Sequence, residues 1–174
     1  MDKFLIKGPT KLNGTIKISG AKNAALPIMA ACLAKPGVYQ LKNIPNLRDT
    51  RTMSKLLKII GCKIFNSKSI LTIDTRNCDN PEAPYDLVKT MRASFYVLGP
   101  LLARFGTVKV SLPGGCAWGP RPVDFHLKGL EALGARITLR NGYILAEANR
   151  LKGTNINFKF PSVGATGNIV MAAS

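Results

Sequence analysis

The segment 113-PGGCAWGPRPVDFH-126 concentrates side chains that could do chemistry. It holds a thiol at Cys116, a guanidinium at Arg121, a carboxylate at Asp124 and the only histidine of the chain, His126. Three glycines and three prolines among its first ten residues predict a loop, because proline removes a backbone donor and glycine favours unusual dihedral angles. A cysteine beside a cation loses its proton more readily and can act as a nucleophile or proton donor. A structural thiol in a turn is the alternative.

Two further cations, Lys22 and Arg92, stand 70 residues apart at the predicted starts of two helices. The first turn of a helix exposes unpaired N–H groups and a partial positive charge, so a cation there disfavours the helix and favours a bound anion. Arg121 adds a third cation to the same region if its loop folds back. A solvent-exposed side chain explains either helix cation singly, whereas two at matched positions favour an anion site.

These cations are matched because the chain repeats itself after about seventy residues. Gly37 aligns with Gly106 and Gly61 with Gly134, and each unit reads helix, strand, helix, strand, strand. A third unit begins at FPSVGATGNIVMAAS and stops within its first helix. Two segments before the first unit, FLIKG and TIKIS, predict a pair of strands.

The two helices of each unit differ in their hydrophobic pattern. The first helix, over 21–34 and from 85 or 90 to 103, is apolar all round after its opening turn, which predicts burial on every side. The second helix, over 49–60 and 124–133, has one apolar stripe and predicts a half-exposed position. Helices inside and sheets outside satisfy both patterns. We therefore expect an α/β (α+β) fold, an inside-out α/β barrel of β-α-β-α-β-β units that is truncated in its third unit.

The composition is that of a globular chain with an excess of positive charge. The 174 residues are 46% hydrophobic, and 25 basic against 9 acidic residues give a net charge of +16. This charge favours anionic partners, either nucleic acid or small phosphorylated substrates, although a solvated lysine-rich surface explains most of it. The sequence shows no signal peptide and no apolar segment long enough to span a bilayer, so we expect a cytoplasmic protein without a membrane partner.

The four cysteines lack the spacing of a metal site, and one histidine cannot build a typical zinc site with them. We therefore interpret them as reduced thiols. Cys32 and Cys62 fall in apolar runs and are expected in the core, whereas Cys78 lies in a polar turn with no evident partner.

Four motifs, SGAKNAALP, APYDLVKTMRAS, SLPGGCAWGPRPVDFH and PSVGAT, resemble those of the UDP-N-acetylglucosamine 1-carboxyvinyltransferase family of enolpyruvyl transferases. They occur in the family's order and spacing, and the resemblance extends over the whole chain. It implies transfer of the enolpyruvyl group of phosphoenolpyruvate to the 3-hydroxyl of UDP-N-acetylglucosamine with release of phosphate, the first committed step of peptidoglycan precursor synthesis. It implies these two molecules as partners, and neither a metal nor an organic cofactor.

The resemblance also implies roles for particular residues. Cys116 delivers a proton to the methylene carbon of phosphoenolpyruvate and can add covalently to the enolpyruvyl carbon, in a loop that closes as a lid. A cysteine here, rather than an aspartate, implies alkylation by the epoxide antibiotic fosfomycin. The residues expected to bind phosphoenolpyruvate are Lys22, Arg92 and Arg121. The residues expected to bind the UDP-sugar are Asn23, Arg92, Arg121, Pro122, Val123, Asp124, Phe125, Ser162, Val163 and Gly164.

The family chain has a second domain of the same repeats, which the resemblance implies as a partner. We expect residues 1–20 to form a strand pair that packs against it, and residues 21–174 to form the first domain, with two complete repeats and the start of a third. The chain alone is then a substrate-binding half that lacks the catalytic groups of the second domain. Two positions depart from the family pattern: Phe160 stands where lysine is common, and Gly167 where glutamate is common.

A basic, non-enzymatic module that binds nucleic acid is the main alternative, although the sequence lacks the aromatic-interleaved strand pattern of RNA-binding modules. Salt-dependent binding of DNA or RNA without nucleotide-sugar binding would support it. A third possibility is an inactive remnant of a truncated reading frame, which the intact Lys22, Arg92, Cys116 and Arg121 disfavour.

Overall fold

The computed structural model of the chain describes residues 3–67, 70–113 and 123–174. The first unit comprises α1 (Lys22–Ala31), β1 (Val38–Lys42), α2 (Arg48–Ile59), β2 (Lys63–Ser67) and β3 (Ile70–Asp74). The second comprises β4 (Glu82–Ala83), α3 (Tyr85–Val88), the 3₁₀ helix η1 (Arg92–Val97), α4 (Leu98–Phe105), β5 (Thr107–Ser111), α5 (Asp124–Ala132), β6 (Arg136–Arg140) and β7 (Tyr143–Glu147). The third begins with α6 (Val163–Ala173). The predicted repeat is thus confirmed.

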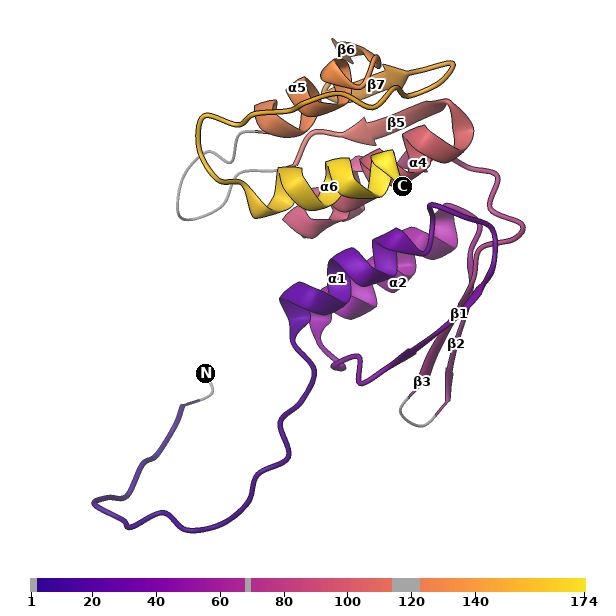
Figure 1. The fold of residues 1–174 in the computed structure, drawn as a ribbon. Helices are drawn as coiled ribbons and strands as arrows, with labels where there is room; N and C mark the ends of the chain where they lie inside the picture. The colour runs from indigo at the N-terminus through magenta and orange to yellow at the C-terminus, as the bar shows by residue number, and fades with distance from the viewer. Residues whose placement is uncertain (1–2, 68–69, 114–122) are drawn as a thin grey trace.

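The two units build sheets of the same topology. β3 lies between β1 and β2 and is antiparallel to both, with Val38 opposite Asp74. β7 lies likewise between β5 and β6, and β4 adds a parallel strand beside β5. Figure 1 shows α1 and α2 beside the first sheet and α4 and α6 beside the second, so that the helices lie between the sheets. The predicted mixed α/β fold is confirmed, and its closure into a barrel stays a prediction.

The turns that end α2 and α5 are equivalent, as the glycine spacing predicted. Gly61 and Gly134 adopt φ angles of 102° and 97°, which glycine reaches without steric cost. Asn141 and Gly142, with φ angles of 51° and 76°, form the two-residue turn that joins β6 to β7. Local turn chemistry therefore fixes where each outer helix stops and where the second hairpin folds.

The first helix of the second unit is broken into pieces. α3 ends at Val88, and helical structure resumes at Arg92, so each of the two predicted starts corresponds to part of it. Pro100 is the third residue of α4, which continues directly from η1. The break places Arg92 at the start of its own helical segment.

The inner helices are buried to different degrees. α4 buries every residue from 98 to 102, as its apolar pattern predicted. Ile28 on α1 and Val170 on α6 remain 48% and 57% exposed, because no element in the described part of the chain packs on these sides. The prediction of burial on every side is therefore wrong for α1. The outer helices α2 and α5 bury a single stripe, which includes Leu57 and Leu130.

Residues 3–20 form neither a helix nor a strand. Their apolar side chains are exposed, for example Phe4 at 99% and Ile16 at 84%, and Figure 1 shows the segment leading away from the body of the molecule. The predicted strand pair is not formed here, because two strands without a further strand or a packed face are only marginally stable. The packing of this segment on a second domain stays a prediction.

The helices are short. α2 is the longest in the described ranges, with 12 residues, whereas a bilayer requires about 20. None of the helices in these ranges is long and apolar enough to cross a membrane.

Candidate functional site

A cavity of about 670 Å³ opens where the first turns of several helices meet. Its wall combines charged, polar and apolar groups from all three units. The lining residues are Lys22, Asn23, Leu26, Asp49, Thr90, Met91, Arg92, Ala93, Phe95, Tyr96, Val123, His126, Pro161, Ser162, Val163 and Gly164. In the described ranges no three His, Cys, Asp or Glu side chains are grouped so as to hold a metal ion.

Five helix starts contribute to this cavity. α1 begins with Lys22, η1 with Arg92 and α6 with Val163, while the first turns of α2 and α5 contribute Asp49 and His126. The residues before α1, η1 and α5 are alanine, methionine and valine, which have no side-chain oxygen to cap a helix. Their first N–H groups are therefore left for water or a ligand. Together with the partial positive charge of each helix start, these groups favour a bound anion.

The Lys22 ammonium lies 2.8 Å from a carboxylate oxygen of Asp49. These side chains are 42% and 30% exposed, so the pair contributes only about 0 to 1 kcal/mol to stability. The main effect of the pair is on position, because Asp49 holds the Lys22 ammonium at the wall of the cavity. Asp49 is absent from the sequence-based site. The repeat offered a signal for it, since Asp49 and Asp124 both stand in the first turn of a second helix.

A hydrogen-bond network sets the position of the proton on His126. Asn168 Oδ1 accepts a bond from the Gly99 N–H at 2.6 Å, and Asn168 Nδ2 donates to the Phe95 carbonyl and to His126 Nδ1, both at 3.0 Å. Because the backbone N–H can only donate, this orientation of the amide makes Nδ1 an acceptor and leaves the imidazole proton on Nε2. A Cβ placed on Gly164 would lie 3.2 Å from that Nε2. His126 thus presents an N–H donor at the cavity wall, a role that its place in the sequence left open.

Burial keeps the His126 ring neutral. It lowers the pKa of His126 from the ordinary 6.5 to about 4, and the Arg92 guanidinium acts in the same direction against the opposing effect of Asp124. The ring is therefore an uncharged hydrogen-bond donor at neutral pH.

We expect the free energy of unfolding to fall as the pH drops from 6.5 towards 4. In this window the unfolded chain protonates His126 and the folded chain does not, so unfolding takes up a proton and acid favours it. The contribution of His126 is complete above pH 6.5 and is on the order of 3 kcal/mol. Urea unfolding at about pH 5 and about pH 7.5 measures about 2 kcal/mol of this difference, because pH 5 is only part of the way to the folded pKa. In His126→Gln most of it should vanish, and an unchanged pH dependence would assign it to other groups.

The cavity brings together most of the predicted site residues that the structure describes. These are Lys22, Asn23, Arg92, Val123, Ser162, Val163 and Gly164. Asp124 and Phe125 do not line it: an Asp124 carboxylate oxygen lies 4.0 Å from the Lys128 ammonium, and the ring of Phe125 stacks on Phe158 with centres 5.3 Å apart. The predictions for Cys116, Arg121 and Pro122 concern residues outside the described ranges.

Two departures from the family pattern lie near the cavity. Phe160 is 60% exposed, and the Lys159 ammonium lies 5.6 Å from the centre of its ring. A Cβ on Gly167 would lie 3.1 Å from the Tyr96 ring, which lines the cavity. A glutamate at position 167 would therefore have to displace Tyr96, whereas glycine leaves room for it.

The fold and the cavity together define an α/β domain that gathers helix starts and two cations, Lys22 and Arg92, at one cavity. A family model, described as EPSP synthase (3-phosphoshikimate 1-carboxyvinyltransferase), matches residues 6–174. The chain belongs to this family.

Curated relatives narrow the similarity further. The UDP-N-acetylglucosamine 1-carboxyvinyltransferase of Geotalea daltonii is 52% identical over 174 residues, which cover 100% of this chain and 42% of the relative. That of Prosthecochloris aestuarii is 55% identical over 177 residues, again covering 100% of this chain and 42% of the relative. The chain thus spans less than half the length of these relatives.

Solved structures share the fold. The enolpyruvyl transferase NikO from Streptomyces tendae matches with a TM-score of 0.70 and 24% identity, over 83% of this chain and 32% of that one. An EPSP synthase from Acinetobacter baumannii matches with a TM-score of 0.68 and 18% identity, over 91% of this chain and 37% of that one. At these identities the likeness shows the fold alone.

Proposed function

We propose that this chain forms the substrate-binding half of an enzyme that transfers the enolpyruvyl group of phosphoenolpyruvate to the 3-hydroxyl of UDP-N-acetylglucosamine and releases phosphate. The observation that carries the proposal is the cavity in which Lys22 and Arg92 stand at two helix starts and face a third, at residues 162–164. Both substrates are anions, which such a site favours. The names of the relatives that are more than half identical support the same pair of substrates.

In this proposal the cations of the cavity hold the smaller substrate. Lys22, Arg92 and Arg121 bind the phosphate and carboxylate of phosphoenolpyruvate, because a guanidinium matches two oxygens of either group at once. The nucleotide sugar contacts Asn23, and its diphosphate accepts hydrogen bonds from the first N–H groups of α6 and from Nε2–H of His126. Because the His126 ring is already neutral at physiological pH, it can donate this hydrogen bond without gaining or losing a proton.

The chemistry then proceeds by addition and elimination. The Cys116 thiol protonates the methylene carbon of phosphoenolpyruvate, the adjacent carbon becomes electrophilic, and the 3-hydroxyl oxygen of the sugar attacks it and loses its proton. Phosphate leaves with its bridging oxygen, and loss of a proton from the methyl group restores the double bond. The cations stabilise the negative charge throughout. Val123, which directly follows the cysteine loop in sequence, lines the cavity. This supports the proposal that Cys116 acts at the same cavity.

We place the reaction in the cytoplasm, as the first committed step of peptidoglycan precursor synthesis, and propose fosfomycin as an inhibitor through Cys116. A second domain of the same repeats would supply the remaining catalytic groups. The curated relatives, which are more than twice as long as the matched segment, support such a partner.

Fosfomycin is expected to label Cys116 selectively among the four cysteines. Cys32, Cys62 and Cys78 are all buried, which hinders alkylation by the epoxide, and burial also raises the pKa of Cys32 to about 11, so its reactive thiolate is scarce at neutral pH. Mass spectrometry of the trypsin-digested chain locates the adduct, and UDP-N-acetylglucosamine should increase its yield. Arg121→Ala should reduce the yield, whereas Arg140→Ala, which removes an exposed guanidinium, should not. Equal labelling of all cysteines, or none, would contradict an assembled half-site.

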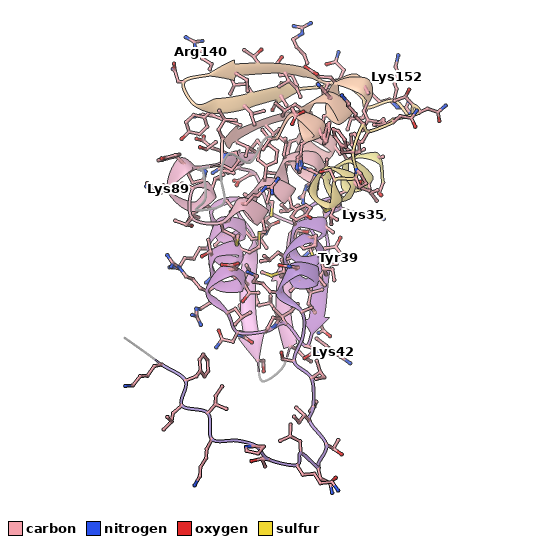
Figure 2. The ribbon with its side chains drawn as sticks, turned by 90° about the vertical axis from the view of Figure 1, so that its left-hand side faces the viewer. Lys35, Tyr39, Lys42, Lys89, Arg140 and Lys152 are labelled. Atoms are coloured by element: carbon pink, nitrogen blue, oxygen red, sulfur yellow. The ribbon has the colours of Figure 1, made fainter. Side chains whose placement is uncertain are left out.

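A nucleic-acid-binding module is the second candidate, and the net charge of +16 favours it. Figure 2 shows Lys35, Lys42, Lys89, Arg140 and Lys152 spread from the first unit to the last sheet, not gathered in one stripe. A phosphate backbone is usually met by a continuous basic surface. Salt-dependent binding of a DNA duplex without any binding of UDP-N-acetylglucosamine would favour this candidate.

A further inference from the structure

Cys62 and Cys78 form a buried pair of thiols that does not line the cavity. Their Sγ atoms lie 3.0 Å apart, and the two residues are only 4% and 7% exposed. Cys78 therefore has a partner, which its polar turn did not indicate. The functional proposal uses neither thiol.

The backbone around both cysteines is pinned in place. Cys62 N–H donates to the Leu57 carbonyl at 2.9 Å, in the turn that ends α2. Asn80 binds the same helix end, because its backbone N–H donates to the Ile60 carbonyl at 3.4 Å and its side chain to the Ile59 carbonyl at 3.1 Å. The two segments are thus held together independently of the thiols. A disulfide bond of about 2.05 Å requires the sulfur atoms to approach by only about 1 Å more.

The two thiols differ in acidity. The hydrogen bond between the two thiols lowers the pKa of Cys78 against the opposing effect of burial, and the Arg104 guanidinium also lowers it. That guanidinium is anchored beside the pair, because it donates to the Thr75 carbonyl at 2.7 Å and to the Leu33 carbonyl at 3.3 Å. The hydrogen bond and burial raise the pKa of Cys62. We expect Cys78 to attack first and Cys62 to follow, and the substitutions described below test this order.

We propose that Cys62 and Cys78 are a reversible redox modification site, at which exchange with a small oxidised thiol compound forms an intramolecular disulfide. The Cys78 thiolate attacks one sulfur of the small disulfide, forms a mixed disulfide and expels the first small thiolate. Cys62 then loses its proton, attacks Sγ of Cys78 and expels the second. The protein loses two electrons and two protons, and the small disulfide becomes two thiols.

The bond would close a ring around the β2–β3 hairpin and tie the end of α2 to the segment that leads to β4. A cross-link of this kind restricts the unfolded chain, so we expect the oxidised form to unfold at a higher urea concentration than the reduced form. Since the first turn of α2 carries Asp49, the bond also restrains the helix that holds Lys22 at the cavity.

Peptide mapping of the full chain tests the proposal. The chain is equilibrated in glutathione buffers of graded ratio and its free thiols are alkylated before digestion. Trypsin places Cys62 in residues 59–63 and Cys78 in residues 77–89, so a disulfide appears as one cross-linked pair of peptides. We expect this pair to dominate in oxidised glutathione and to disappear in dithiothreitol.

Single substitutions test the order of attack. Cys32→Ala should leave the cross-link intact, and Cys78→Ala should abolish it. Cys62→Ala should leave Cys78 as a mixed disulfide with glutathione. Two results on the unsubstituted chain would overturn the proposal: no cross-link in fully oxidised glutathione, or a preferred cross-link through Cys32 or Cys116. Circular dichroism during oxidation establishes that the folded chain is the species that reacts.

Discussion

Alanine in place of Lys22 or Arg92 will weaken the binding of phosphoenolpyruvate by about 10- to 100-fold for each substitution, and the double variant will show no measurable binding. Each cation stands at the first residue of a helical segment and faces the same cavity. Both can therefore contact one anion, and the loss of a charge-assisted hydrogen bond explains the size of the effect. Isothermal titration in the presence of UDP-N-acetylglucosamine measures the affinities.

The matched control is Lys35→Ala, which removes the same charge from an exposed lysine just after α1. It should change the affinity by less than about twofold at moderate salt, because exposed charges beyond a Debye length are screened. If Lys35→Ala weakens binding as much as Lys22→Ala does, the overall charge of the chain, and not the cavity, attracts the ligand. Circular dichroism of all variants separates loss of binding from loss of fold.

Asn168→Ala is expected to lower the free energy of unfolding by about 3 to 5 kcal/mol. The side chain is fully buried between α6, α4 and α5. Its removal leaves three buried groups without their partner: the Gly99 N–H, the Phe95 carbonyl and Nδ1 of His126. Urea unfolding measures the loss.

Asn149→Ala removes the same atoms from an exposed position and should change stability by less than about 0.5 kcal/mol. A loss below about 1 kcal/mol for Asn168→Ala would mean that water satisfies the buried groups once the amide is gone. The network would then position His126 without stabilising the fold.

The repeat explains why so much of the architecture follows from the sequence. The spacing between Gly61 and Gly134 is nearly the same as that between Lys22 and Arg92. The elements of one unit therefore predict those of the other, and the two cations fall at equivalent helix starts. The repeat alone gives matched positions for Lys22 and Arg92; that both line one cavity comes from how the helices pack.

Other features depend on contacts that no local pattern encodes. The pairing of Cys62 with Cys78 and of Lys22 with Asp49 arises where segments distant in sequence pack together. Residues 3–20 alternate like strands, yet a strand exists only where another strand pairs with it. The exposed side of α6 also depends on distant contacts. The apolar sequence of this helix indicates that each side can be buried, but not which element would bury it.

The ion pair of Lys22 with Asp49 makes ligand binding an exchange of counter-ions. To contact the Lys22 ammonium, an incoming anion must replace the Asp49 carboxylate, whose oxygen already lies 2.8 Å from it. A singly charged buffer ion such as chloride or acetate offers Lys22 no more than Asp49 does, so it gains little by the exchange. A phosphate group brings more charge and more acceptor oxygens, and it can use the neighbouring helix N–H groups at the same time. Because the exposed pair is worth only about 0 to 1 kcal/mol, this competition weakens a singly charged ligand by at most about fivefold, and in the proposed function it favours multiply charged substrates to the same modest extent.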